Sequence, residues 1–147
     1  MPGKAEVLRS GGQVALWALG AMVEVALAAA QLLEAQGTPV TVVDARWVKP
    51  LDEELINQLA RNHEVLLTIE EGAVGGFGAF TLQLMASRGL LDSHLKVRTL
   101  TLPDVFQDQD KPEVMYANAG LTAQHIAKQS IIALGRGDTN MAGAVAS

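Results

Sequence analysis

The chain has 147 residues, a formal net charge of −5, 49% hydrophobic residues and no cysteine. A chain of this length fits one domain that can bury about 70% of its unfolded surface, and the lack of cysteine excludes disulfides, thiolate metal sites and cysteine nucleophiles. An acidic chain without long charge runs also lacks the basic stripe of a nucleic-acid groove, so we expect no nucleic-acid partner.

The first part of the chain alternates strand and helix patterns. Residues 5–9 form a short segment suited to an edge strand, and the apolar run 14–19 predicts a buried strand. Residues 21–36 predict a helix that ends at Gly37, because glycine often follows the last turn of a helix. The next strand is expected at residues 40–43.

The pattern continues to the last helix. Asp52 is expected to cap a helix, and the apolar run 65–69 predicts a third main strand. A helix at 79–86, a strand at 97–102 and a final helix at 122–134 follow. Repeated strand–helix alternation with short connections predicts an α/β domain, in which a parallel sheet carries helices on its faces.

We expect one domain over residues 1–134 and a disordered tail over residues 135–147, which are small, polar and unpatterned. Residues 14–33 are nearly continuous apolar sequence of about the length of a membrane span. Gly20 divides this run, and Glu24 lies at its centre, where a charge is costly in lipid. We therefore expect a strand and a buried helix here, and no membrane span.

The segment between the strand at 65–69 and the helix at 79–86 is rich in glycine. Such glycines provide positive φ angles or a close approach of the backbone. The spacing does not match G-x-G-x-x-G or a P-loop, and Glu70 and Glu71 would repel an anion, so a structural turn is favoured over a phosphate site. We expect one glutamate to cap the helix or pair with a neighbour, and the other to face solvent. The turn glycines are Gly72, Gly75, Gly76 and Gly78.

The segment 44–52 places a basic and an aromatic residue after a strand. Arg46 and Trp47 are residue types that anchor interfaces, so we expect them to contact a partner. The alternative is that Arg46 pairs with a carboxylate inside the domain and Trp47 covers the core. The residues alone predict no self-sufficient catalytic set.

Four strings, in this order, resemble the C-terminal domain of transketolase-like enzymes, and within them the 1-deoxy-D-xylulose-5-phosphate synthases. They are DARWVKPLD at 44–52, EEGAVGGFG at 70–78, LPDVF at 102–106 and AGLT at 119–122. The resemblance extends over residues 4–134. It implies a three-layer fold, with a five-stranded, mostly parallel sheet that has one antiparallel edge strand and helices on both faces.

The resemblance also implies a parent reaction and a division of labour. These synthases condense pyruvate with glyceraldehyde 3-phosphate, release carbon dioxide, use thiamine diphosphate and Mg²⁺, and feed isoprenoid and thiamine biosynthesis in the cytoplasm. Their cofactor and catalytic residues lie in the amino-terminal and middle domains. We therefore transfer no catalytic, cofactor-binding or metal-binding residue to this chain, and we expect it to be inactive alone.

The same resemblance names the partners and their contacts. In this family the third domain packs against the other two domains and contributes to a homodimer. Arg46, Trp47, Glu71 and Phe77 are then expected as interdomain contacts, and the isolated domain should expose an apolar patch.

Two other interpretations remain open at this point. The chain could be the same domain of a transketolase or of a 2-oxo-acid dehydrogenase β subunit, although the strings at 49–52 and 102–104 favour the synthase. Alternatively, it could be a stand-alone module that binds a small anion at the glycine turn, against which Glu70 and Glu71 argue.

Overall fold

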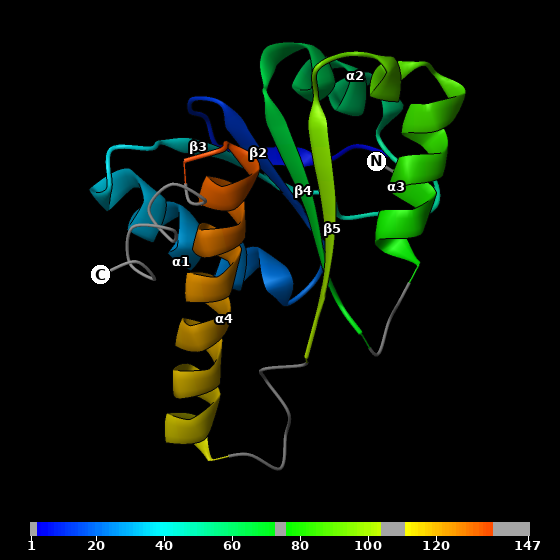
Figure 1. The fold of residues 1–147 in the computed structure, drawn as a ribbon. Helices are drawn as coiled ribbons and strands as arrows, with labels where there is room; N and C mark the ends of the chain where they lie inside the picture. Colours follow the sequence, from blue (N-terminus) through cyan, green and yellow to red (C-terminus); the bar gives the residue numbers. More distant parts are fainter. Residues whose placement is uncertain (1–2, 73–75, 104–110, 137–147) are drawn as a thin grey trace.

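The computed structural model describes residues 3–72, 76–103 and 111–136 (Figure 1). They form a five-stranded sheet in the order β1-β3-β2-β4-β5. The strands are β1 (Glu6–Arg9), β2 (Val14–Ala18), β3 (Val40–Asp44), β4 (Val65–Glu71) and β5 (Lys96–Leu102). The helices are α1 (Met22–Ala35), α2 (Glu53–Asn62), α3 (Phe77–Ser87) and α4 (Pro112–Ala133), with a 3₁₀ turn η1 (Leu90–Asp92).

Strand pairing follows the chain connections. The central strand β2 pairs in parallel with β3 and β4, and β4 pairs in parallel with β5, because a helix or a helical crossover separates these strands along the chain. The edge strand β1 pairs antiparallel with β3, and its register shifts between Val7 and Arg9. The predicted mostly parallel sheet with one antiparallel edge strand is confirmed.

The three central strands β2, β3 and β4 are buried on both faces, which explains their continuous apolar sequences, whereas the edge strands β1 and β5 are largely exposed. Alternate side chains such as Leu16 and Leu67 pack toward α1 and α4. Their neighbours, such as Trp17 and Leu66, pack toward α2 and α3. Figure 1 shows one layer of helices on each side of the sheet, α1 and α4 on one side and α2 and α3 on the other, so the chain forms three layers.

Three predicted boundaries were wrong. Helix α4 begins at Pro112 and not at Thr122, because proline fits the first turn of a helix and Gly120 does not interrupt it. Strand β4 continues through Glu71, and α3 begins at Phe77. The glycine turn is therefore shorter than its sequence indicates.

Residues 135 and 136 of the predicted tail are described. The Arg136 guanidinium donates hydrogen bonds to Gln13 Oε1 at 2.9 Å and to Thr38 Oγ1 at 3.3 Å, at the amino ends of the strands. The rest of the predicted tail, 137–147, lies outside the described residues. Among the helices that the structure describes, none is long and apolar enough to cross a membrane.

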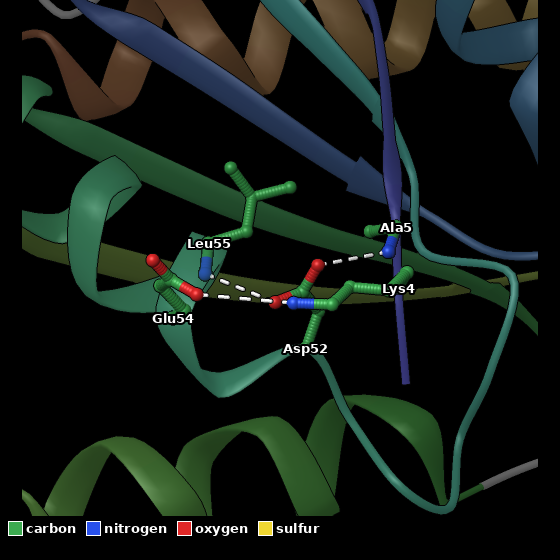
Figure 2. A network of polar contacts seen from close by, with 5 residues as sticks. All are labelled: Lys4, Ala5, Asp52, Glu54 and Leu55. Carbon is green, nitrogen blue, oxygen red and sulfur yellow. Dashed lines mark hydrogen bonds and ion pairs between the residues drawn. The ribbon is translucent and has the colours of Figure 1, made fainter. Parts of the chain in front are cut away.

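Asp52 joins the amino-terminal segment to α2, as Figure 2 shows. Its buried carboxylate accepts from Leu55 N at 3.1 Å, which caps α2 as predicted, and from Ala5 N at 2.9 Å. Beside it, Lys4 Nζ lies 3.8 Å from Glu54 Oε2. One side chain therefore fixes both the start of α2 and the entry into β1.

Candidate functional site

The two segments that the sequence singled out each follow a parallel strand. The segment 44–52 begins at the last residue of β3, and the glycine turn follows β4, on either side of β2. Because parallel strands end at the same edge of a sheet, both segments lie at its carboxyl edge, where α/β proteins bind their ligands. Arg46, Trp47 and Glu71 are thus brought to one edge of the molecule.

Glu70 is turned inward and closes the start of α3. Its side chain is 3% exposed, and its two carboxylate oxygens accept from Phe77 N at 3.1 Å and from Gly78 N at 2.5 Å. The carboxylate satisfies two free N–H groups of the first turn and places a negative charge at the positive end of the helix. It therefore occupies the position that an external anion would take, and the prediction that one glutamate caps the helix is confirmed.

Two glycines of the turn meet requirements of this arrangement. Gly76 precedes α3 with a φ of +87°, a conformation that other residues rarely adopt. A Cβ on Gly78 would lie 2.8 Å from Thr68 Oγ1 and 2.9 Å from Glu70 Oε2. Gly78 therefore lets α3 approach β4 closely enough for the Glu70 carboxylate to reach its N–H groups.

The other predicted members of the turn are less constrained or are not described. A Cβ on Gly72 would meet Thr101 Cγ2 at 3.5 Å, an ordinary contact. Glu71 is half-buried at the end of β4. Gly75 lies outside the described residues.

Phe77 lies in the core of this domain. Its side chain is fully buried and stacks on Trp17, with ring centroids 6.1 Å apart and an interplanar angle of 15°. Trp17 Nε1 donates to Thr81 Oγ1 at 3.2 Å, and that hydroxyl donates to Phe77 O at 2.9 Å. Phe77 holds α3 against β2, so its side chain has no exposed surface to offer to a neighbouring domain.

Arg46 has a strained backbone. Its φ of +66° is the only positive value for a non-glycine residue in the described ranges. Trp47 N donates to Ala45 O at 2.6 Å, which makes Arg46 the central residue of a γ-turn, and Arg46 N donates to Asp44 Oδ1 at 3.0 Å. Arg46 Nη2 also lies 3.4 Å from Glu6 Oε2, which matches the alternative that this arginine pairs inside the domain.

Trp47 remains partly exposed beside this turn. Its side chain is 38% exposed, although tryptophan is usually well buried. A few residues later Lys49 Nζ lies 4.4 Å from the centre of the Phe80 ring, so the segment after β3 contacts α3. The carboxyl edge therefore presents an aromatic surface beside a strained, hydrogen-bonded turn.

One ion pair links the helices that follow the two segments. Arg88, at the end of α3, donates a hydrogen bond to Glu53 at the start of α2. This hydrogen bond, together with the attraction between the charges, lowers the pKa of Glu53 and raises the pKa of Arg88. Both side chains are exposed, so the pair is a minor contributor to stability.

The described residues do not fit the Mg²⁺ and diphosphate that the resemblance implies. Magnesium takes several oxygen ligands in octahedral geometry, with help from phosphate oxygens. Among residues 3–72, 76–103 and 111–136, no group of three or more His, Asp or Glu side chains could hold a metal ion. The start of α3, which suits a phosphate by its dipole, already holds Glu70. We derive no chemical step through these groups.

Comparison with known proteins agrees with the fold. A family model for the transketolase C-terminal domain matches residues 3–126. A solved structure described as a split gene transketolase, inactive beta4 tetramer, superposes with a TM-score of 0.72 and 32% sequence identity. The match covers 92% of this chain and 42% of that chain, so this chain spans less than half the length of its structural neighbour. The chain belongs to the transketolase C-terminal domain family.

Proposed function

We propose that this chain is the C-terminal domain of a thiamine-diphosphate-dependent 1-deoxy-D-xylulose-5-phosphate synthase, and that it serves the assembly of the enzyme. The whole enzyme would condense pyruvate with glyceraldehyde 3-phosphate, with loss of carbon dioxide, in the supply of isoprenoid precursors. The strings KPLD at 49–52 and LPD at 102–104 support the synthase over other members of the family.

The carboxyl edge carries the proposed assembly role. The protein keeps Arg46 in a strained conformation and leaves Trp47 partly exposed at this edge. Backbone strain persists where function or the surrounding structure requires it, and a half-exposed tryptophan is a typical anchor of an interface. We infer that Trp47 and the backbone around Arg46 contact another domain of the enzyme.

The structural neighbour supports a role in a larger assembly. It is described as a tetramer of one chain of a split transketolase, and its chain is more than twice as long as the part that this chain matches. We propose that the partners here are the amino-terminal and middle domains and a second copy of the enzyme. The cysteine-free sequence is compatible with a reducing cytoplasm, which we propose as the location.

Two alternatives to the synthase are a transketolase and a stand-alone module that binds a small anion. A transketolase would share the domain and the assembly role, and its substrates would distinguish it. A stand-alone anion-binding module is disfavoured because the Glu70 carboxylate fills the start of α3. Calorimetry with phosphates and nucleotides tests that module: saturable binding that Gly76→Val abolishes would support it.

Mixing with the missing domains tests the proposal directly. We expect no activity from this chain alone. With a polypeptide carrying the first two domains, thiamine diphosphate and Mg²⁺, we expect pyruvate-dependent formation of 1-deoxy-D-xylulose 5-phosphate. Activity only with transketolase substrates would identify a transketolase. If mixing gave neither association nor activity, the assembly role would be wrong.

A pair of matched variants locates the contact in the same assay. Trp47→Ala should raise the concentration of this chain needed for half-maximal activity by about tenfold or more, because aromatic anchors carry much of the energy of an interface. Leu91→Ala is the control, since Leu91 has nearly the same exposure, 37%, but lies in η1, before the amino end of β5. Equal effects of the two variants would argue against a contact at Trp47.

A further inference from the structure

A histidine joins three segments at the amino edge of the sheet. His63 follows the last residue of α2, and its Nδ1 lies 2.9 Å from Leu59 O, in the last turn of that helix. Its Nε2 lies 2.8 Å from Thr41 Oγ1, near the start of β3. The Thr41 hydroxyl donates to Gly11 O at 2.8 Å and accepts from Gly11 N at 3.0 Å, between β1 and β2. One imidazole therefore links α2, β3 and the connection between β1 and β2.

The contacts of this network determine where its hydrogens lie. A carbonyl oxygen only accepts, so the contact with Leu59 O requires a hydrogen on His63 Nδ1, and Gly11 O takes the only hydrogen of the Thr41 hydroxyl. Gly11 N uses one lone pair of that hydroxyl, and the second lone pair faces His63 Nε2, which must then donate as well. All four contacts are satisfied together only when both ring nitrogens carry a hydrogen.

A neutral imidazole loses one of these contacts. With its hydrogen on Nε2, the Nδ1 lone pair would face the carbonyl of the buried Leu59, and two acceptors repel each other. With its hydrogen on Nδ1, Nε2 competes with Gly11 O for the hydrogen of the Thr41 hydroxyl. The second form costs less, because it leaves only the carbonyl of the half-buried Gly11 to be solvated. Loss of the proton therefore moves the hydroxyl hydrogen from Gly11 O to His63.

The charges around His63 come from several elements. The carboxyl end of α2 carries the partial negative charge of the helix dipole, which stabilises a cation there. Arg61 of α2, Glu64 before β4 and His94 before β5 line one pocket with His63, and all three are exposed, so water and salt screen them. On the other side of the ring, the residues of β1, β3 and their connections that line a second pocket carry no ionisable side chain. The hydrogen bonds and the helix end thus both favour the protonated ring.

We propose that His63 is a proton-controlled clamp at the amino edge of the sheet. When His63 is protonated, Thr41 holds Gly11 by both its N–H and its carbonyl, which ties the connection between β1 and β2 to β3 and α2. When the proton leaves, the hydroxyl turns to Nε2 and Gly11 O is released. Histidine changes charge between about pH 5 and 8, so the clamp tightens in mild acid. This device is independent of the proposed function.

Nitrogen-15 NMR of the histidine rings in the whole chain tests the placement of the hydrogens. At about pH 5 both ring nitrogens of His63 should be protonated, and at about pH 8 the neutral ring should carry its hydrogen on Nδ1. The exposed His94 is the internal reference and should take the Nε2–H form that histidine prefers in water. A neutral His63 ring with its hydrogen on Nε2 would overturn the inference.

Matched variants measure the clamp itself. Thr41→Val keeps the shape of the side chain and removes the hydroxyl. The melting temperature that it loses should be about 3 °C greater at about pH 5 than at about pH 8, since protonation adds one hydrogen bond in the wild type only. Thr101→Val removes an exposed hydroxyl from β5 and is the control, whose effect should be the same at both pH values.

A second pair of variants assigns the pH dependence to one histidine. In chains that carry His63→Gln, the loss caused by Thr41→Val should no longer depend on pH, because glutamine does not titrate. In chains that carry His94→Gln, the dependence should remain. A loss that is independent of pH in the wild-type background, or a pH dependence that survives His63→Gln, would overturn the inference.

Discussion

The ends of β3 and β4 lie at the same edge of the sheet but are built in opposite ways. After β4, the chain turns inward: Glu70 is buried and satisfies the first turn of α3. After β3, the chain turns outward: Arg46 adopts a strained conformation and Trp47 remains partly exposed. At the end of β4, the polar groups of the first turn of α3 are satisfied within the domain. At the end of β3, by contrast, the backbone is strained and an aromatic side chain is exposed.

The comparison shows that the segment with the most unusual sequence is not the one that exposes side chains suited to binding. The glycine-rich segment is the more unusual string, yet the described part of it serves local structure, because Gly76 and Gly78 let Glu70 close the start of α3. The segment after β3 has an ordinary composition but carries the exposed tryptophan. An unusual composition therefore indicates an unusual backbone, and a role in binding has to be argued from exposed side chains.

The largest loss of stability is expected at Glu70, after β4. Glu70→Ala would leave the N–H groups of Phe77 and Gly78 buried without an acceptor, and should lower the free energy of unfolding by about 3 kcal/mol. Urea unfolding measures this change. Glu24→Ala removes an exposed carboxylate from the first turn of α1 and should cost well under 1 kcal/mol. Equal losses in the two variants would show that Glu70 does not close α3.

Gly78→Ala should cause the next largest loss of stability. The added methyl group would lie 2.8–2.9 Å from Thr68 Oγ1 and Glu70 Oε2, and neither buried group can move freely. We expect a loss of about 2 kcal/mol in the same unfolding experiment, as for overpacked cores. Gly72→Ala is the matched control, because its Cβ would make only an ordinary contact at 3.5 Å. A neutral Gly78→Ala would contradict the close approach of α3 to β4.

At Arg46, after β3, we expect a glycine variant to be more stable than an alanine variant, which is the reverse of the usual order. Arg46→Gly and Arg46→Ala both remove the contact with Glu6, but only glycine relieves the positive φ. The glycine variant should therefore have a free energy of unfolding about 1 kcal/mol higher than the alanine variant. At positions with an ordinary, negative φ, glycine instead gives the less stable protein. Thermal unfolding of the two variants measures the difference. If alanine proved more stable, Arg46 would not be strained.

The smallest effect concerns the ion pair that links α2 and α3. Because Arg88 lowers the pKa of Glu53 in the folded state, the pair stabilises the fold above the ordinary pKa of glutamate. This contribution is lost as the pH falls through the lowered pKa of the folded state. The small difference in stability between the wild type and Glu53→Gln should therefore be present at neutral pH and vanish in acid, once the pH lies below the lowered pKa of Glu53 in the folded state. A difference independent of pH would rule out the charge of Glu53 as its cause.

Much of the fold follows from local patterns in the sequence. Apolar runs located the central strands, and the alternation of strands and helices predicted a parallel sheet. Asp52 was identifiable as a cap because aspartate before a helix has a favoured hydrogen-bond geometry. Adjacent residues on a strand point to opposite faces, so a single inward glutamate at positions 70 and 71 was also predictable.

Long-range packing was not accessible in the same way. Phe77 contacts Trp17, which lies far away in the chain, so no local pattern revealed that this aromatic side chain is buried. The start of α4 was misplaced because Gly120 followed by Thr122 is typical of the end of one helix and the start of another. The positive φ of Arg46 depends on the turn after β3, and its residue type gave no indication of it.

The central claim is that the end of β3 is an assembly surface, and hydrogen exchange measured by mass spectrometry tests it most directly. The chain would be compared alone and after addition of a polypeptide carrying the first two domains of the synthase. We predict slower exchange in peptides covering residues 45–51, and little change in peptides from residues 65–70, whose backbone is already bonded in the sheet. Binding that left exchange at residues 45–51 unchanged would contradict the account.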